Sequence, residues 1–393
     1  MFARVRLRDR DIVCVGFADW DADLWTNQQH LMSRLATDNR VLFVESLGLR
    51  RPQLAGRDLR RIGRRLRRGI APPRSVDGLH VLAPLVLPLH DRPWARRLNA
   101  WLLRRQVGRA TRRLGFRDPL LWSYVPQADA LVDSLRPSQV VYHCVDDIAA
   151  QKGVAGDAFR AAEARFVARA GLVLASAPQL AERMRGLGAN VLDAPNVADT
   201  ARFAQALEPG EVDPAVAALP RPRLVFTGAV VATKLDLAFL GDLAAARPDW
   251  SLVLVGPVGA GDPATDVSAL GAAPNIHLLG PRRYGDLPAV LRGAEAGLIP
   301  YAINDLTRSV FPMKVYEYLS AGLPVVSTPL PALAGVAGIT IVADPAAAER
   351  AVLELLAADT PAARRARSDA AQAHSWDARL EEIARAVEET PQR

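Results

Sequence analysis

The sequence predicts an α/β protein with two doubly wound domains, each built on a parallel sheet. Three observations lead to this fold class. The chain has 393 residues, more than one ordinary hydrophobic core accommodates. Short apolar runs rich in β-branched residues alternate with helical stretches along the whole chain. A stretch containing Pro, Glu and Gly, "EPGEVDPAVAALPRP", separates these runs into two series and has the composition of a linker.

Each series of apolar runs supplies the strands of one domain. The first series predicts strands at Ile12–Phe17, Val41–Glu45, His80–Leu82, Leu120–Tyr124, Val140–Cys144 and Leu172–Ser176. The second predicts strands at Arg223–Gly228, Ser251–Gly256, Asn275–Leu279, Ala296–Pro300, Pro324–Thr328 and Ile339–Val342. Helical segments such as Leu235–Ala246 and Tyr284–Arg292 separate the strands of the second series.

These elements define the expected domain organisation. We expect an N-terminal Rossmann-like domain over residues 1–205, a C-terminal Rossmann-like domain over 206–375, and a final helix over 376–393. Because ligands of doubly wound sheets bind at the carboxyl ends of the strands, we expect the two domains to face each other across a ligand cleft. A dinucleotide-binding enzyme is disfavoured, since Gly16 stands alone after the first strand and no G-x-G-x-x-G follows it.

The composition argues against several other classes. No uncharged apolar run approaches the roughly 20 residues of a membrane span. The first apolar run is also too short for the core of a signal peptide. Cys14 and Cys144 lie in apolar, strand-like runs, so they offer neither a disulfide framework nor a zinc site. We therefore expect a soluble, cytoplasmic protein.

Positive charge is concentrated in the first half of the chain. Residues 51–117 hold 18 arginines against three aspartates, which indicates an anionic partner. Within them, residues 57–70 read "RDLRRIGRRLRRGI", with an apolar stripe formed by Leu59, Ile62, Leu66 and Ile70. Such a segment either packs on the domain core or lies on an anionic membrane, and the basic, Trp-containing stretch "WARRLNAWLLRRQVGRATRR" favours the membrane. Nucleic acid is disfavoured, because charge alone supports it.

Lysine is rare in this chain. Only three of its 49 basic residues are lysines, namely Lys152, Lys234 and Lys314. One of them stands in "FPMKVYEYLSAGLPVV", three residues before Glu317 and close to Pro312, where a helix is expected to begin. An ammonium there suits a diphosphate, and a carboxylate one turn later suits the two hydroxyls of a ribose. The alternative is an exposed Lys–Glu pair on a helix surface.

Several motifs together carry a family resemblance. They are "GLIPYAINDLTRSVFPMKVYEYLSAGLPVVST", "PNVADTARF", "RPDWSLVLVGP" and "HSWDARLEEIARAV". They resemble the nucleotide-sugar domain, the domain junction and the C-terminal crossing helix of GT-B fold glycosyltransferases, specifically the retaining group-one (family four) class. "WDADLWTNQQHLMSRLA" and "VVYHCVDDI" look like acceptor-loop and cleft elements of members that build bacterial cell-surface polysaccharides. The resemblance is dense over roughly residues 170–390.

The resemblance implies roles for residues of the second domain. Glu317 matches the family's ribose-binding glutamate, and Lys234 and Lys314 fall beside the donor diphosphate. Two family positions differ: the first glutamate of the motif falls on Ser309, and the diphosphate-binding arginine falls near Ala229, after Gly228. The remaining donor-binding candidates are Asn304, Asp305 and Arg308 for the sugar and Arg282 and Tyr284 for the base.

In the first domain the resemblance points to a histidine near the donor sugar. The matching position holds Tyr124, so His143 at the end of the next strand is the catalytic candidate beside Lys234, Lys314 and Glu317, although a strand-end histidine is more often structural. The expected acceptor-side residues are Asp19, Trp20, Trp25, Asn27 and Tyr124. "DWDAD" also contains a D-x-D pair that holds a metal in another glycosyltransferase fold, but its place directly after the first strand favours an acceptor loop.

The resemblance therefore implies a retaining, metal-independent glycosyltransferase. Its donor is a nucleoside-diphosphate sugar, and no further cofactor or metal is expected. Its acceptor is expected to be a lipid-linked sugar or a glycan at the cytoplasmic face of the cell membrane, where the protein binds peripherally. Two alternatives stay open: a catalytically degenerate scaffold of a polysaccharide assembly complex, and a nucleotide-sugar epimerase of the same fold.

Overall fold

The chain folds into two compact units. The computed structural model describes residues 6–22, 25–48, 71–87, 89, 92–151, 153–260, 262 and 264–391. One unit comprises Met1–Pro195 with Leu380–Arg393, and the other comprises Asn196–Arg379. The boundary at Pro195 lies somewhat before the boundary after residue 205 that the sequence suggests. The basic segment 57–70 lies outside the described residues.

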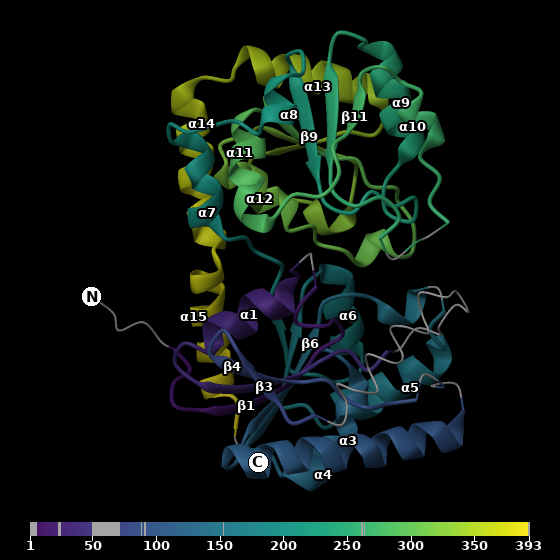
Figure 1. The fold of residues 1–393 in the computed structure, drawn as a ribbon, viewed down its shortest axis with the longest axis vertical. Helices are drawn as coiled ribbons and strands as arrows, with labels where there is room; N and C mark the ends of the chain where they lie inside the picture. The colour runs from purple at the N-terminus through teal and green to yellow at the C-terminus, as the bar shows by residue number, and fades with distance from the viewer. Residues whose placement is uncertain are drawn as a thin grey trace. The chain divides into compact units, whose positions relative to one another are not determined.

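Among the described residues, the sheet of the first unit has eight strands in the order β3-β4-β2-β1-β5-β6-β7-β8. Figure 1 labels four of them, β1, β3, β4 and β6. The strands are β1 (Asp11–Val15), β2 (Arg40–Val44), β3 (Arg74–Val76), β4 (Leu79–Leu82), β5 (Leu120–Ser123), β6 (Gln139–Cys144), β7 (Leu172–Ala175) and β8 (Val191–Asp193). All neighbours pair in parallel except β3 and β4. Strands β1, β5, β6 and β7 are buried along their whole length, as their continuous apolar sequences require.

Helices cover this first sheet. They are α1 (Asn27–Leu35), α3 (Pro93–Leu114), α4 (Asp129–Leu135), α5 (Gly156–Val167) and α6 (Pro178–Gly186). Helix α3 packs on α4 and turns Leu103 and Val107 into the core. It ends at Gly115, whose left-handed backbone (φ 67°) closes the last turn. Within the described residues, no helix combines the length and apolar character needed to cross a bilayer.

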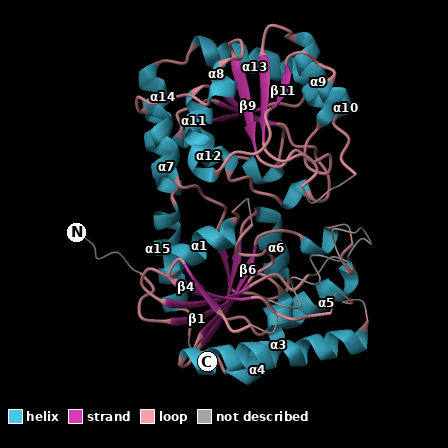
Figure 2. Ribbon diagram, in the orientation of Figure 1, coloured by secondary structure: helices cyan, strands magenta, loops and turns pink. Residues whose placement is uncertain are grey.

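The sheet of the second unit, as far as the structure describes it, has six parallel strands in the order β11-β10-β9-β12-β13-β14. Figure 2 shows strands of this sheet, with β9 and β11 labelled, among the helices of the unit. The strands are β9 (Arg223–Thr227), β10 (Ser251–Val255), β11 (Ile276–Leu278), β12 (Ala296–Ile299), β13 (Val325–Ser327) and β14 (Ile339–Ile341). All five pairs of neighbouring strands are parallel. Such a sheet needs helical layers on both faces.

Two groups of helices supply these layers (Figure 1). Helices α10 (Ser268–Gly271) and α13 (Pro345–Ala357) contact α9 (Leu237–Ala246). Helix α12 (Lys314–Ser320) contacts α7 (Thr200–Ala204) and α14 (Pro361–Ala371), and α7 also contacts α11 (Leu287–Arg292). The short helix α8 (Pro214–Ala217) is capped by Asp213. The last helix, α15 (Trp376–Glu389), begins in the second unit and ends in the first.

The C-terminal end of α15 is hydrogen-bonded to the first sheet. Gln139, the first residue of β6, donates hydrogen bonds from Nε2 to the carbonyl oxygens of Val387 (2.8 Å) and Thr390 (2.9 Å). Gln139 is only 5% exposed, so its amide is satisfied by the end of α15 rather than by water.

Every strand predicted from the sequence is present, with ends that differ by a residue or two, and the predicted α/β fold class is confirmed. Two strands were not predicted. Strand β3 pairs with β4 through a turn at Asp77 and Gly78, whose positive φ angles (48° and 82°) define the Asp-Gly type of tight hairpin. Strand β8 is a short edge strand beside β7.

Candidate functional site

The order of strands reverses once in each sheet, beside the first strand of the unit. In the second unit β9 lies between β10 and β12, and in the first unit β1 lies between β2 and β5. Doubly wound proteins bind ligands at the carboxyl ends of the strands, beside the loops that follow the two diverging strands. In the second unit these positions are Gly228 after β9 and residues 301–306 after β12.

Gly228 and Lys314 meet at this point of the second sheet. A Cβ atom on Gly228 would lie 2.7 Å from Cε and 2.8 Å from Nζ of Lys314, so only glycine leaves room for the lysine. The backbone of Gly228 also has a φ of 132°, which L side chains rarely adopt. The Lys314 ammonium lies 5.3 Å from the centroid of the Phe226 ring, within the range of a cation–π contact. The ammonium is therefore held over the end of β9.

Lys314 is the first residue of α12, and Glu317 follows within its first turn. Glu317 is 7% exposed, and burial raises the pKa of its carboxyl group while the positive charge of Lys314 opposes that rise. Among the residues that the structure describes, neither side chain has an ion-pair partner within 4 Å, and no protein group donates a hydrogen bond to the Glu317 carboxylate. A buried carboxylate without a partner is costly for the fold, so these two groups are available for a ligand.

Tyr318 fixes the orientation of α12. Its Oη accepts a hydrogen bond from the backbone N–H of Thr227 (2.7 Å) and lies 3.1 Å from the Thr227 hydroxyl. Its ring lies against Gly297 of β12, where a Cβ atom would come within 2.3 Å of Cδ2. Sequence reasoning missed this residue. The signal was Gly297, because a glycine inside a strand marks a close approach by another group.

Lys234 is positioned by the loop that follows β12. The backbone N–H of Ala302 donates to the carbonyl of Lys234 (2.9 Å), and Asn304 Nδ2 donates to the carbonyl of Thr233 (3.1 Å). Asn304 Oδ1 accepts the backbone N–H groups of Leu306 and Thr307, both at 3.0 Å. The Asn304 amide therefore holds the loop to the lysine-bearing segment, which makes it a positioning group in this structure.

The other predicted sugar contacts differ in exposure. Asp305 and Arg308 are exposed, whereas Ser309 is 9% exposed and ends a 3₁₀ turn, Thr307–Ser309. Thr307 shapes this turn, since its hydroxyl lies within hydrogen-bond reach of the Ala302 carbonyl.

The two predicted base contacts make structural interactions. Arg282 donates from Nε to Asp213 (2.7 Å) and from Nη1 to the carbonyl of Leu279 (2.8 Å). The hydrogen bond from Arg282 lowers the pKa of the Asp213 carboxyl group, the N-cap of α8. Tyr284 stands edge-on to Phe203, with ring centroids 5.6 Å apart. The Arg282 guanidinium thus stabilises this loop of the second unit.

In the first unit, the ring of His143 stacks on the ring of Tyr124, with centroids 4.9 Å apart and an interplanar angle of 23°. Tyr124 follows β5 at the strand reversal, and its Oη donates to Asn27 Oδ1 (3.1 Å). All three residues are buried, His143 and Tyr124 to 1% exposure, and burial raises the pKa of the Tyr124 hydroxyl. The structure therefore brings together three of the residues predicted from the sequence, at the carboxyl ends of β5 and β6 and the start of α1.

The other predicted acceptor-side residues follow β1. Trp20 is 2% exposed and packs between Trp25 (5.7 Å between centroids) and Phe43 (5.0 Å), so it belongs to the core. Asp19 is exposed, and Asp21 is paired with Arg74 at 2.8 Å. In the described part of the chain, no three His, Cys, Asp or Glu side chains are grouped so that they could hold a metal ion.

The architecture of the whole chain is that of GT-B glycosyltransferases. The sucrose-phosphate synthase of Thermosynechococcus elongatus superposes with a TM-score of 0.68 at 15% identity, covering 96% of this chain and 98% of that one. The Anabaena protein HepE, solved in complex with UDP and glucose, superposes with a TM-score of 0.62 at 13% identity, covering 97% of this chain and 100% of that one. These likenesses define the fold.

Two sequence comparisons relate this chain to glycosyltransferases, and one of them falls within the second unit. Residues 221–358, which run from β9 through α13, match the family model described as "Glycosyl transferases group 1". TuaH of Bacillus subtilis (strain 168), assigned to teichuronic acid biosynthesis as a glycosyltransferase, is 36% identical to this chain over 100 residues. That stretch is 25% of this chain and spans only 24% of the length of TuaH. The second unit thus contains the stretch that matches the group 1 glycosyl transferase model.

Proposed function

We propose that this protein is a glycosyltransferase that moves a sugar from a nucleoside-diphosphate sugar to a lipid-linked or glycan acceptor at the cytoplasmic face of the membrane. The observation that carries this proposal is the pair formed by Lys314 and Glu317. The first holds an ammonium over Gly228, and the second is a buried carboxylate that has no partner among the described residues. Both belong to the domain that matches the group 1 family.

The chemistry of the pair fits a nucleoside diphosphate. The Lys314 ammonium and that of Lys234 would neutralise the negative charge that grows on the leaving diphosphate, which is the main demand of glycosyl transfer. Glu317 has the acceptor oxygens that a ribose diol needs, because a carboxylate accepts two hydrogen bonds from adjacent hydroxyls. UDP bound to HepE, a protein of the same fold, supports this class of donor.

The resemblance of the motif around Glu317 supports transfer with retention of configuration and without a metal ion. In that mechanism the acceptor attacks from the face that the nucleoside diphosphate leaves, and the cations of the protein take the place of a metal. We propose His143 and Tyr124 as the residues of the first unit that lie beside the sugars, since the resemblance implies a histidine there and the two rings stack at the carboxyl ends of β5 and β6. Ser309, where the family has a glutamate, is proposed to change which donor sugar is accepted.

The proposal is tested by measuring nucleoside-diphosphate release from a panel of UDP-, GDP- and TDP-sugars, with and without EDTA and acceptor lipid. We expect release from one donor, unaffected by EDTA and lost in Glu317→Ala. Glu354→Ala is the matched control, because Glu354 is exposed on α13. The anomeric configuration of the product, read by NMR, tests retention.

Each of the other outcomes supports a different mechanism or function for this protein. Release that EDTA abolishes contradicts metal independence. Conversion of the donor sugar to its epimer without release indicates an epimerase. Donor binding with no turnover, even with acceptor lipid present, indicates a scaffold of a polysaccharide assembly complex. Ser309, which stands where the family motif has a glutamate, is compatible with such a loss of catalysis.

A further inference from the structure

Helix α3 (Pro93–Leu114) of the first unit has a charge pattern unlike that of an ordinary surface helix. Its 22 residues include seven arginines and no aspartate or glutamate. A solvated helix normally mixes both signs of charge, which pair along its surface. The acid-free composition means that α3 itself supplies no carboxylate to pair with its arginines.

The two faces of α3 are sharply different. The inner face buries Ala95, Asn99, Leu103, Val107, Ala110 and Thr111. The outer face carries a stripe at helical spacing that is apolar at its N-terminal end and cationic at its C-terminal end. In order, the stripe consists of Trp94, Leu98, Trp101, Arg105, Arg109 and Arg112.

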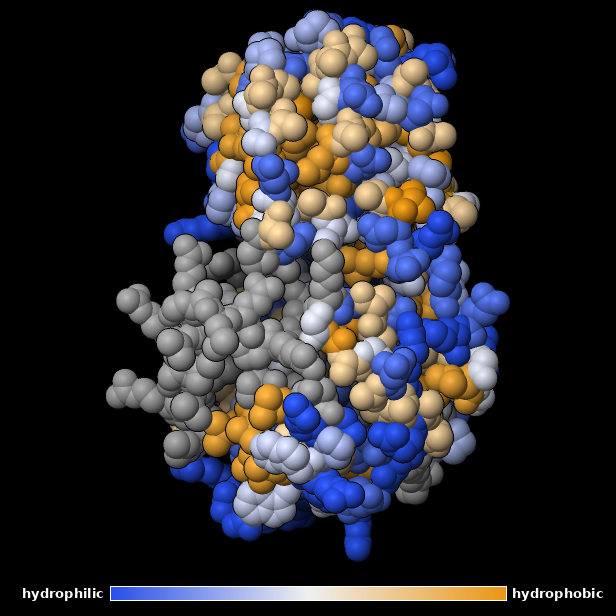
Figure 3. Space-filling model, turned by 90° about the vertical axis from the view of Figure 1, so that its right-hand side faces the viewer, coloured by the Kyte–Doolittle hydropathy of each residue, from blue (hydrophilic) through white to orange (hydrophobic). Residues whose placement is uncertain are grey.

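The apolar end of the stripe is exposed to solvent. Trp94 is 56% exposed, Leu98 is 38% exposed and Trp101 is 49% exposed. Leu89, just before the helix, is 42% exposed. Single exposed apolar residues are common, but four close together on one helix and its approach mark an interaction surface. In Figure 3, hydrophobic and hydrophilic residues are mixed over the lowest part of the surface, at the level of α3 in Figure 1.

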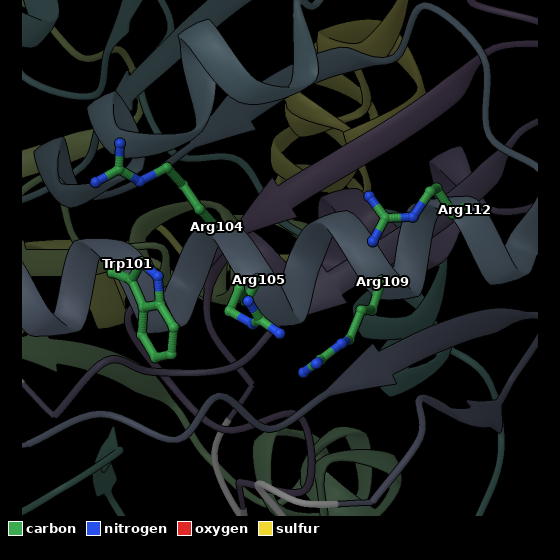
Figure 4. Close-up of a pocket in the computed structure, with 5 residues that line it drawn as sticks. All are labelled: Trp101, Arg104, Arg105, Arg109 and Arg112. Atoms are coloured by element: carbon green, nitrogen blue, oxygen red, sulfur yellow. The ribbon is translucent and has the colours of Figure 1, made fainter.

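The cationic end lines a shallow, open hollow of about 490 Å³. Trp101, Arg104, Arg105, Arg109 and Arg112 line it, and Figure 4 shows all five side chains directed away from the helix axis. The guanidinium of Arg105 lies over the Trp101 ring, 5.1 Å from its centroid. Among the described residues, none of these four arginines has a carboxylate within 4 Å. The hollow therefore concentrates unneutralised positive charge beside an indole ring.

We propose that the outer face of α3 docks this protein on an anionic lipid bilayer. Trp94, Leu98 and Trp101 enter the headgroup region, where indole rings and apolar side chains are both accommodated. Arg105, Arg109 and Arg112 bind lipid phosphates, for which a guanidinium fork is well shaped. This proposal rests on the proposed function only for its purpose, which is to bring the transferase to a lipid surface. Binding to the bilayer itself needs no turnover.

A membrane accounts for both halves of the stripe, whereas nucleic acid accounts for one. Nucleic acid would engage the arginines and could stack on a tryptophan, but it would leave Leu98 and the far Trp94 in water. A bilayer offers an apolar layer next to a layer of phosphates, which is the order of residues along α3. The helix also needs no conformational change, because its outer side chains are already exposed.

The test is co-sedimentation of the full chain with vesicles of phosphatidylcholine alone or with 30% phosphatidylglycerol, in the absence of any donor. Wild type is expected to bind the anionic vesicles, and binding is expected to fall at high salt. A triple variant should weaken vesicle binding roughly 100-fold, because each cation near an anionic surface contributes roughly fivefold. This variant combines Arg105→Ala, Arg109→Ala and Arg112→Ala. The matched control combines Arg165→Ala, Arg350→Ala and Arg385→Ala, which removes the same charge from exposed positions on α5, α13 and α15.

The apolar end is tested separately. Trp94→Ala with Trp101→Ala should weaken vesicle binding by at least about tenfold, and bromine-labelled lipids should quench tryptophan fluorescence in wild type but not in this variant. Equal vesicle binding by wild type and the α3 arginine variant overturns the proposal. So does tighter binding to a DNA or RNA duplex than to vesicles. Release of nucleoside diphosphate from a soluble donor should be unchanged in these variants, so a failure of catalysis and a failure of docking are seen independently.

Discussion

Glu317→Gln should make the protein more stable and less active at the same time. The carboxylate is 7% exposed, has no hydrogen-bond donor among the described residues, and has a pKa raised by burial. Replacing it with a neutral group of the same shape removes the cost of burying a charge. We expect the free energy of unfolding to rise by about 1 kcal/mol near neutral pH, which corresponds to about 2–4 °C in the melting temperature of a unit of this size.

The pH dependence of this effect follows from the direction of the pKa shift. A carboxyl group with a raised pKa in the folded state stabilises the protein when protonated, and that stability is lost as pH rises through the folded pKa. The advantage of Glu317→Gln should therefore be present at pH 7.5 and vanish below about pH 4, where wild type is protonated in both states.

The assay is thermal unfolding followed by circular dichroism at a series of pH values, paired with nucleoside-diphosphate release at pH 7.5. Glu354→Gln on the exposed face of α13 is the matched control and should change neither quantity. A Glu317→Gln protein that is less stable than wild type at pH 7.5 and keeps its turnover would refute the reasoning, because the carboxylate would then serve the fold and not the ligand.

Three further variants probe the same site. Gly228→Ala forces a methyl group against Lys314 and strains the backbone, so the Michaelis constant for the donor should rise at least about tenfold and stability should fall by more than about 1 kcal/mol, as measured by kinetics and urea unfolding. Tyr318→Phe leaves the Thr227 N–H without its acceptor and should cost about 1–3 kcal/mol in urea unfolding, with Tyr316→Phe as the comparison. Asn304→Ala releases its loop from the lysine-bearing segment and should raise the donor Michaelis constant several-fold without changing the melting temperature by more than about 2 °C.

The strands were readable from the sequence because they are buried on both faces and appear as continuous apolar runs, such as Leu252–Val255 in β10. Strand β3 has no such run. Its signal was the Asp-Gly pair at 77–78, which is typical of a tight hairpin and points to a strand on each side. Turn chemistry, which the prediction did not use, could have located this edge strand where hydrophobicity could not.

The geometry of the candidate site could be predicted where residue type and helix position determine it, and less so where residues distant in the sequence pair with a side chain. Lys314 and Glu317 stand one turn apart because both belong to α12. Arg282 looked equally available, but Asp213, far away in the sequence, holds its guanidinium. The Asn304 amide likewise bonds to protein groups, the carbonyl of Thr233 and the backbone N–H of Leu306. Pairings of this kind depend on tertiary contacts that no local pattern encodes.

The most direct test of the central claim is to label the lysines with and without a nucleoside diphosphate. Only Lys152, Lys234 and Lys314 carry a side-chain amine, so an amine-specific reagent read by mass spectrometry reports on each separately. With saturating UDP, GDP or TDP, we predict that one nucleotide protects Lys314 and Lys234 and leaves Lys152 labelled as before. Equal labelling of Lys314 with and without every nucleotide would contradict the account, since the ammonium over Gly228 would then not be a phosphate ligand.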